Sequence, residues 1–145
     1  MEPATRCENI VMIYTRLIDG IRGYDKGSLG LVICAQVKKS VSKFSEKYPD
    51  IFTVHINEEI KISVKPGARE KEVMEALNDL YTMIRYQLKG IMGDAGDGIM
   101  RNASKVVYKE SISEIKTLRI VFPGWFRDQM QKAIWIDSII KIFKG

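Results

Sequence analysis

The residue types that most often carry catalysis or bind metals are scarce in this chain of 145 residues. His55 is the only histidine, and the only two cysteines, Cys7 and Cys34, lack the close spacing of metal ligands. A zinc site or a serine–histidine–aspartate arrangement would need His55, whose neighbours on the expected hairpin are lysine and threonine. The sequence therefore predicts no catalytic centre, metal site or cofactor, and it favours a protein that is not an enzyme. An enzyme built on an unfamiliar set of residues stays open.

A glycine-rich segment has the most phosphate-binding character, and its residues are Gly93, Asp94, Gly96, Asp97 and Gly98. Glycines before a helix can present backbone N–H groups to an anion. The segment lacks the Gly-Lys-Ser/Thr of a phosphate-binding loop, however, and its aspartates would repel phosphate. The aspartates could hold a divalent cation, but their spacing is not that of an EF-hand loop. The favoured interpretation makes Gly93 the C-cap of one helix and Asp94 or Asp97 the N-cap of the next.

Basic residues form two stripes at helical spacing, each opposite an apolar face. The stripes are Lys39, Lys43 and Lys47, and Arg101, Lys105 and Lys109. If their helices lie side by side, the stripes form one positive surface that suits nucleic-acid phosphates or another acidic partner. No aromatic residues alternate with these positions, so a solvated helix face is the favoured interpretation.

The last predicted helix, over about 125–143, is apolar on more than one side. Beyond its main stripe it carries four further apolar residues: Ile134, Trp135, Ile139 and Ile142. Such a helix either occupies the centre of a bundle or contacts a second molecule, and aromatic anchors are typical of interfaces. The two interpretations carry equal weight. A membrane-surface helix is disfavoured because the polar positions are mixed in charge.

The hydrophobic pattern predicts a mostly α-helical fold of about five helices in a small bundle, forming a single domain over 1–145. Four helices are expected over about 8–22, 28–47, 69–92 and from near 98, before the one at the C-terminus. Ser28 is a plausible N-cap, Ile91 and Val106 are expected to face inward, and the capping-box spacing at 111–114 suggests a further helix start. The stretch 117–122 fits either a helix or a strand, which leaves a minor α+β sheet possible.

Between the second and third helices, over about 51–65, the period changes from helical to alternating. One set of alternating residues is apolar: Phe52, Val54, Ile56, Ile60, Ile62 and Val64. Two such runs around a polar turn predict a β-hairpin with one apolar face. An isolated hairpin is marginal in water, so this face should lie on the helices or pair with another strand.

Composition and charge limit the classes of function. The net charge of +5 is mild, and no apolar run approaches the length of a membrane-spanning helix. No signal peptide is recognisable, so a cytoplasmic location is expected. The leading hypothesis is a non-enzymatic protein-interaction or regulatory module, homodimeric through the C-terminal helix or bound there to another protein. The alternatives are a nucleic-acid-binding protein that uses the basic stripes, and a small-ligand sensor with 93–98 at the mouth of its pocket.

Overall fold

The structure is a computed structural model that describes residues 3–25, 27–124, 127, 139–140 and 142–143. The elements run in the order α1 (Pro3–Arg22), α2 (Ser28–Lys47), β1 (Phe52–Ile56), β2 (Ile60–Val64), α3 (Glu70–Met92) and α4 (Asp94–Leu118). This confirms the mostly helical fold with a hairpin between the second and third helices. Four helices stand in this part of the chain instead of about five, because the predicted helix over 125–143 lies mainly outside the described residues.

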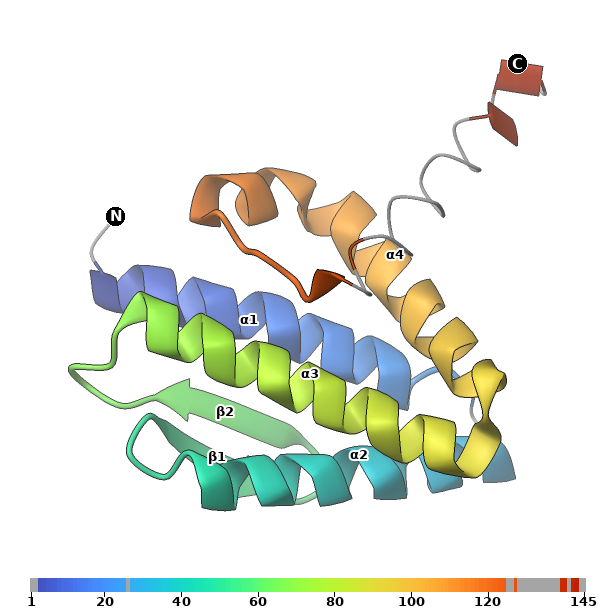
Figure 1. Cartoon of the computed structure of the whole chain (residues 1–145), viewed down its shortest axis with the longest axis horizontal. Helices are drawn as coiled ribbons and strands as arrows, with labels where there is room; N and C mark the ends of the chain where they lie inside the picture. The colour runs from blue at the N-terminus through green and yellow to red at the C-terminus, as the bar shows by residue number, and fades with distance from the viewer. Residues whose placement is uncertain (1–2, 26, 125–126, 128–138, 141, 144–145) are drawn as a thin grey trace.

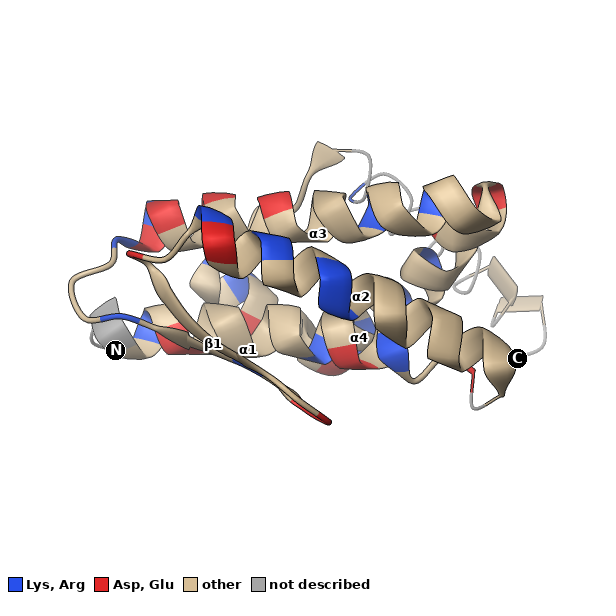
Figure 2. Cartoon of the chain, turned by 90° about the horizontal axis from the view of Figure 1, so that it is seen from below, with Lys and Arg blue, Asp and Glu red and all other residues tan. Residues whose placement is uncertain are grey.

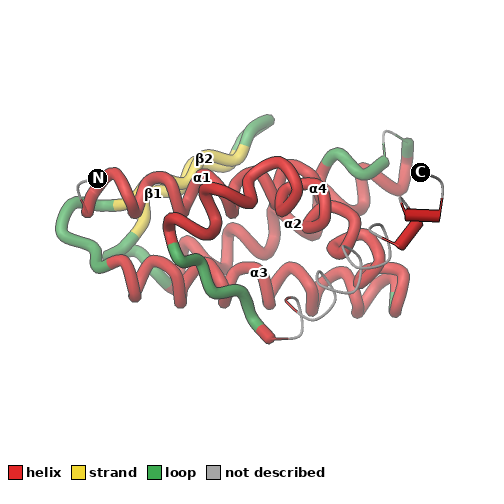
Figure 3. Tube along the Cα trace, turned by 90° about the horizontal axis from the view of Figure 1, so that it is seen from above, coloured by secondary structure: helices red, strands yellow, loops and turns green. Residues whose placement is uncertain are grey.

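Helices α1 and α3 form the central pair of the molecule. Helix α4 covers one side of this pair, and α2 and the hairpin cover the other (Figure 1). Seen from the α4 side, α2 lies behind the central pair, as the tube in Figure 3 shows. The interior between these layers contains side chains that are fully shielded from water: Ile10, Ile13, Leu17, Ile33, Val37, Leu77, Leu80 and Ile84. Because α1 and α3 contribute their apolar stripes to both sides, these two helices were the easiest to predict from periodicity.

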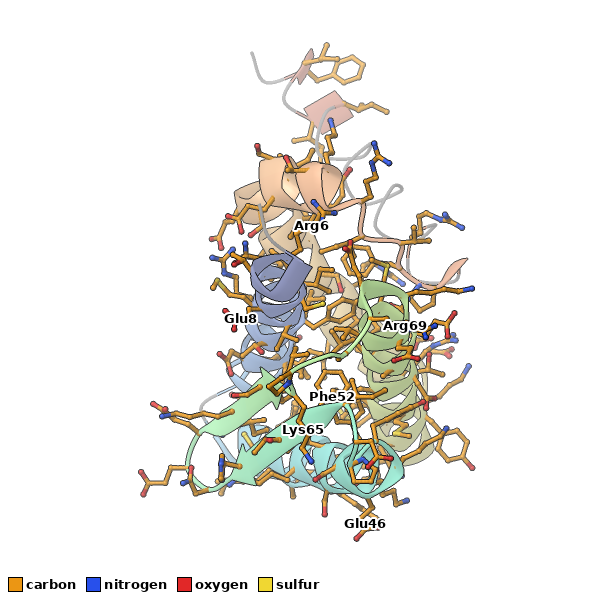
Figure 4. All side chains as sticks on the ribbon, turned by 90° about the vertical axis from the view of Figure 1, so that its left-hand side faces the viewer. Arg6, Glu8, Glu46, Phe52, Lys65 and Arg69 are labelled. Atoms are coloured by element: carbon orange, nitrogen blue, oxygen red, sulfur yellow. The ribbon has the colours of Figure 1, made fainter. Side chains whose placement is uncertain are left out.

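The hairpin forms as predicted, and its apolar residues share one face as predicted. Phe52 pairs with Val64, and Val54 pairs with Ile62, so the apolar residues share one side of the antiparallel ladder. The strand β1 lies against α2, and β2 lies against α1. The Phe52 ring points into the interior, with its centroid 4.9 Å from that of Phe44 (Figure 4). The helices therefore supply the cover that the isolated hairpin would lack.

The expected glycine-rich turn over 93–98 is wrong. Helix α3 ends at Met92, Gly93 has φ 59°, and α4 begins directly at Asp94, earlier than the start predicted near Gly98. Gly93 is the predicted C-cap, but it is also the N-cap of α4, in place of either aspartate. Gly96 is helical, and a Cβ there would lie 3.0 Å from the Leu88 backbone, so this glycine permits a close crossing of α3 and α4. Such a close approach gives glycine a role other than that of a loop residue.

Residues 120–123, which follow α4, form neither helix nor strand, so of the ambiguous stretch 117–122 only the first two residues are helical. Arg119 has left-handed backbone angles, φ 54° and ψ 43°, and it ends the helix. Ile120 and Phe122 are buried, and the Phe122 ring lies 5.5 Å from that of Tyr14. The sheet of the described chain contains only β1 and β2, so no larger α+β sheet forms there. This segment runs along the side of α1 and α3 away from the hairpin, which explains why it cannot pair with β2 (Figure 1).

Helix α4 consists of two helical pieces that meet at the capping-box spacing over 111–114, where the sequence suggested a further helix start. Ser111 has the non-helical angles φ −122° and ψ 19°, which kink the helix. Its side-chain oxygen accepts a hydrogen bond from Arg16 Nη1 at 2.7 Å, which ties the kink to α1. The break at Ser111 therefore separates two helical pieces of α4, in agreement with the helix start that the capping-box spacing suggested.

Two of the residues predicted to face inward are exposed. Ile91 is 52% exposed and Val106 is 53% exposed, whereas Val107 is buried in place of Val106. The reason on α4 is that two serines, Ser104 and Ser111, occupy inward positions about two turns apart in the buried stripe. Polar residues at buried positions conceal the true helical phase from a pattern based on apolar residues alone.

Candidate interaction surfaces

One of the two aspartates of the segment 93–98 is paired with an arginine. Asp97 is 9% exposed, and its two carboxylate oxygens accept hydrogen bonds from Arg85 Nε at 3.0 Å and Nη2 at 3.3 Å. These bonds hold the pKa of Asp97 below its ordinary value. Because Arg85 neutralises this carboxylate, Asp97 has little negative charge to offer a cation. Among the described residues, no group of three or more His, Cys, Asp or Glu side chains is placed to hold a metal ion.

The two predicted basic stripes do not join into one surface. The first lies on α2 and the second on α4, and these helices cover opposite sides of α1 and α3 over most of their lengths (Figure 1). Lys47 is also engaged within the protein, because its ammonium group donates to Asp79 Oδ2 at 2.7 Å. Lys39, Lys43, Arg101 and Lys109 are exposed, and Lys105 is half-buried. Each stripe must therefore be considered as a separate surface.

One stripe adjoins a hollow that sequence reasoning did not predict. The hollow has a volume of about 510 Å³ and lies between α2 and α3. Its lining residues are Gln36, Lys39, Tyr86, Gln87, Lys89, Gly90 and Ile91. Tyr86 is 77% exposed on the outer side of α3. The only signal in the sequence was an aromatic residue out of phase with the apolar stripe of the helix, and that signal does not name a neighbour on α2.

The charge on the surface around this hollow has one sign. Between 28 and 45, and again between 80 and 93, the chain has no aspartate or glutamate. Its basic residues there are Lys38, Lys39, Lys43, Arg85 and Lys89, of which Arg85 is paired with Asp97 of α4. Figure 2 shows the resulting asymmetry on α3, whose first half carries acidic residues and whose second half carries basic ones. The acidic residues of these two helices are thus confined to Glu46 near the end of α2 and to the first half of α3, as far as Asp79.

A second hollow, of about 410 Å³, lies between α1 and α4. Tyr24, Ala103, Val106 and Val107 give it apolar walls, with charged groups at its rim that include Asp19. Burial raises the pKa of Asp19. The lining comes from α1 and the middle of α4, so the segment 93–98 does not stand at its mouth as the sensor hypothesis required.

Ionic and polar contacts join the start of α1 to the start of α3 and the end of α4. Arg6 of α1 donates to both carboxylate oxygens of Glu70 on α3, at 3.1 and 3.0 Å, and to the Leu118 carbonyl at the end of α4, at 3.2 Å (Figure 4). Nearby Cys7 is buried, and burial raises the pKa of its thiol. A buried thiol with a raised pKa is poorly reactive, and both Cys7 and Cys34 are free rather than joined in a disulfide. These contacts therefore stabilise the fold and do not form a reactive site.

The predicted interface at the C-terminus is described only in part. Ile134 and Trp135 lie outside the described residues, Ile139 is half-buried, and Ile142 is 77% exposed. Two neighbouring apolar residues, Ile140 and Phe143, are 44% and 86% exposed. Exposed large apolar side chains thus gather close to the end of the chain.

A scan against models of protein families, a search of curated proteins and a search of solved structures each find no match to this chain. None of the helices in the described residues combines the length and the apolar character that crossing a membrane requires.

Proposed function

We propose that this protein is a non-enzymatic interaction module that forms a homodimer through its C-terminal segment, residues 125–145. The observation that supports this most strongly is the exposure of Ile140, Ile142 and Phe143 in one short stretch. Burying one such side chain contributes roughly 1.5–3 kcal/mol. A second copy of the same segment is the simplest cover, because a two-fold interface brings identical apolar patches together.

A binding role rather than a catalytic one is supported by the buried polar groups, because they form hydrogen bonds with other side chains of the fold. The Tyr81 hydroxyl is buried against the Ser104 hydroxyl, and the Tyr14 hydroxyl donates to Asn78. Burial raises the pKa of both tyrosines, so both stay protonated and neutral. Asp97 is paired with Arg85. Each of these groups is satisfied by a structural partner, and catalysis would instead require a titratable group presented to a substrate.

The dimer is tested by substituting Ile142→Ser and Phe143→Ser together and measuring the mass in solution by light scattering. The expected result is a dimer for the wild type and a folded monomer for the double variant. The matched control is Leu31→Ser on α2, which removes a 75% exposed apolar side chain elsewhere and should remain dimeric. A double variant with unchanged mass, or a monomeric wild type, would contradict the proposal.

A further inference from the structure

The hollow between α2 and α3 combines three kinds of chemistry at one place. Lys39 and Lys89 supply positive charge from the two helices, Gln36 and Gln87 supply amide groups, and Tyr86 supplies an exposed ring. The sequence interpretation disfavoured nucleic acid because no aromatic residue accompanied the lysines. The packing of α3 against α2 places that aromatic residue beside Lys39.

The positive charge continues from the hollow along α2. Lys43 lies one turn beyond Lys39, about 6 Å along the axis, and one turn before Lys47. Lys47 bonds to Asp79 of α3, so the row Lys39, Lys43 and Lys47 runs on the side of α2 that faces α3. The usable part of the row ends at Lys43, because Asp79 holds the charge of Lys47. Lys39 of α2 and Lys89 of α3 thus line the hollow, and Lys43 extends the positive charge one turn further along α2.

We propose that this face of α2 and α3 binds single-stranded nucleic acid. A base stacks on Tyr86, the amides of Gln36 and Gln87 face its edge, and Lys39, Lys43 and Lys89 neutralise phosphates. Stacking on an exposed aromatic ring within a basic groove is the usual mode of binding single strands without strong sequence preference. The inference does not depend on the C-terminal dimer contact.

Charge decides against another copy of this chain as the occupant. The whole chain has a net charge of +5, and its C-terminal segment carries Arg127, Lys132, Lys141 and Lys144 against Asp128 and Asp137. A surface with no acidic residue repels a partner of the same sign. A polyanion is the complementary ligand, and the amides and ring add contacts that suit bases better than lipid chains.

The binding test uses the full-length protein and a fluorescein-labelled oligothymidylate about 12 nucleotides long, with fluorescence anisotropy as the readout. Three phosphate contacts predict binding about 20-fold weaker at about 200 mM than at about 50 mM salt. Replacing Lys39→Glu and Lys89→Glu together should weaken binding at least about 10-fold and flatten this salt dependence. The matched control, Lys61→Glu with Lys71→Glu, changes the net charge equally at exposed sites on β2 and the first turn of α3, and it should retain binding.

Substitutions at Tyr86 distinguish the contribution of base stacking from that of charge attraction. Tyr86→Ala should weaken binding roughly 5- to 100-fold, while Tyr86→Phe, which keeps the ring, should bind within about 2-fold of the wild type.

The monomeric C-terminal variant should still bind, so failure of the dimer proposal is distinguishable from failure of this one. Equal losses in both lysine pairs would overturn the proposal in favour of general attraction. Absence of oligonucleotide binding would overturn it too, and Lys39-dependent binding to phosphatidylserine vesicles would then assign the face to a membrane.

Discussion

Asp97 and Arg85 link α3 to α4 just after the helices cross. The carboxylate is nearly shielded from water and accepts two hydrogen bonds from the guanidinium group, which lower its pKa. In the sequence alone, Asp97 belonged to a glycine-rich segment that suggested a ligand-binding turn. Whether an aspartate binds a ligand or a neighbouring arginine depends on the approach of a residue twelve positions away, at Arg85, and no local pattern contains that information.

Asp97→Asn should reduce the free energy of unfolding at pH 7 by about 2 kcal/mol, since it removes hydrogen bonds between charged groups. A lowered folded-state pKa stabilises the fold above the ordinary aspartate value of about 4, and this contribution disappears as the pH falls through the folded value. Urea unfolding of variant and wild type should therefore differ most near neutral pH and converge in acid. Asp94→Asn, at the exposed start of α4, is the control and should cost less than about 1 kcal/mol. A difference for Asp97→Asn that stays constant into acid would contradict the assignment.

Individual core residues were predictable where a helix has apolar residues at every inward position. Ile10, Ile13 and Leu17 follow this rule, and all three are buried. Val106 does not, because the inward stripe of α4 includes Ser104 and Ser111. Both serines have polar partners, Tyr81 and Arg16, that stand on other helices. Their burial depends on contacts distant in sequence, which is why periodicity failed there.

At the scale of elements, alternation predicted the hairpin well because its turn and its register are local properties. The boundary between α3 and α4 was predicted badly, because the five glycine and aspartate residues of the segment 93–98 are typical of a loop. Gly93 alone makes the reversal, and Gly96 serves the helix crossing. The N-cap of α2 was also predicted one residue late, because it is Gly27 rather than Ser28. In the first turn of this helix, Gly30 lies close to the backbone of Asp25.

Two glycine substitutions with opposite expected effects test these element boundaries. A Cβ at Gly30 would lie 1.8 Å from the Asp25 carbonyl oxygen, so Gly30→Ala must displace the turn between α1 and α2 and should cost more than about 2 kcal/mol. Gly90, inside α3, has open space around the same position, so Gly90→Ala should stabilise the protein by about 0.5–1 kcal/mol. Thermal and urea unfolding measure both. Similar effects of the two changes would show that the close approach at Gly30 is misplaced.

At the scale of the whole molecule, the central pair α1 and α3 separates two surfaces with different chemistry. The α2–α3 side presents the basic face on which Lys39, Lys89 and Tyr86 lie. The α1–α4 side presents an apolar hollow rimmed by charged groups that include Asp19. Sequence reasoning identified the basic stripes but not their separation. The distance between two helices far apart in the chain follows from the packing order, and periodicity within each helix does not determine that order. The exposed apolar residues at the C-terminus give the molecule a third surface, and the proposed homodimer depends on it.

The most direct test of that central claim is native mass spectrometry of the wild-type protein, purified in mild buffer without nuclease. A homodimer should give a species of twice the chain mass of 16.6 kDa that persists across micromolar concentrations. Copurified oligonucleotide would add mass to this dimer without replacing it. A species at the mass of a single chain throughout that range would contradict the proposed homodimer, because the exposed C-terminal residues would then have no partner in a second copy.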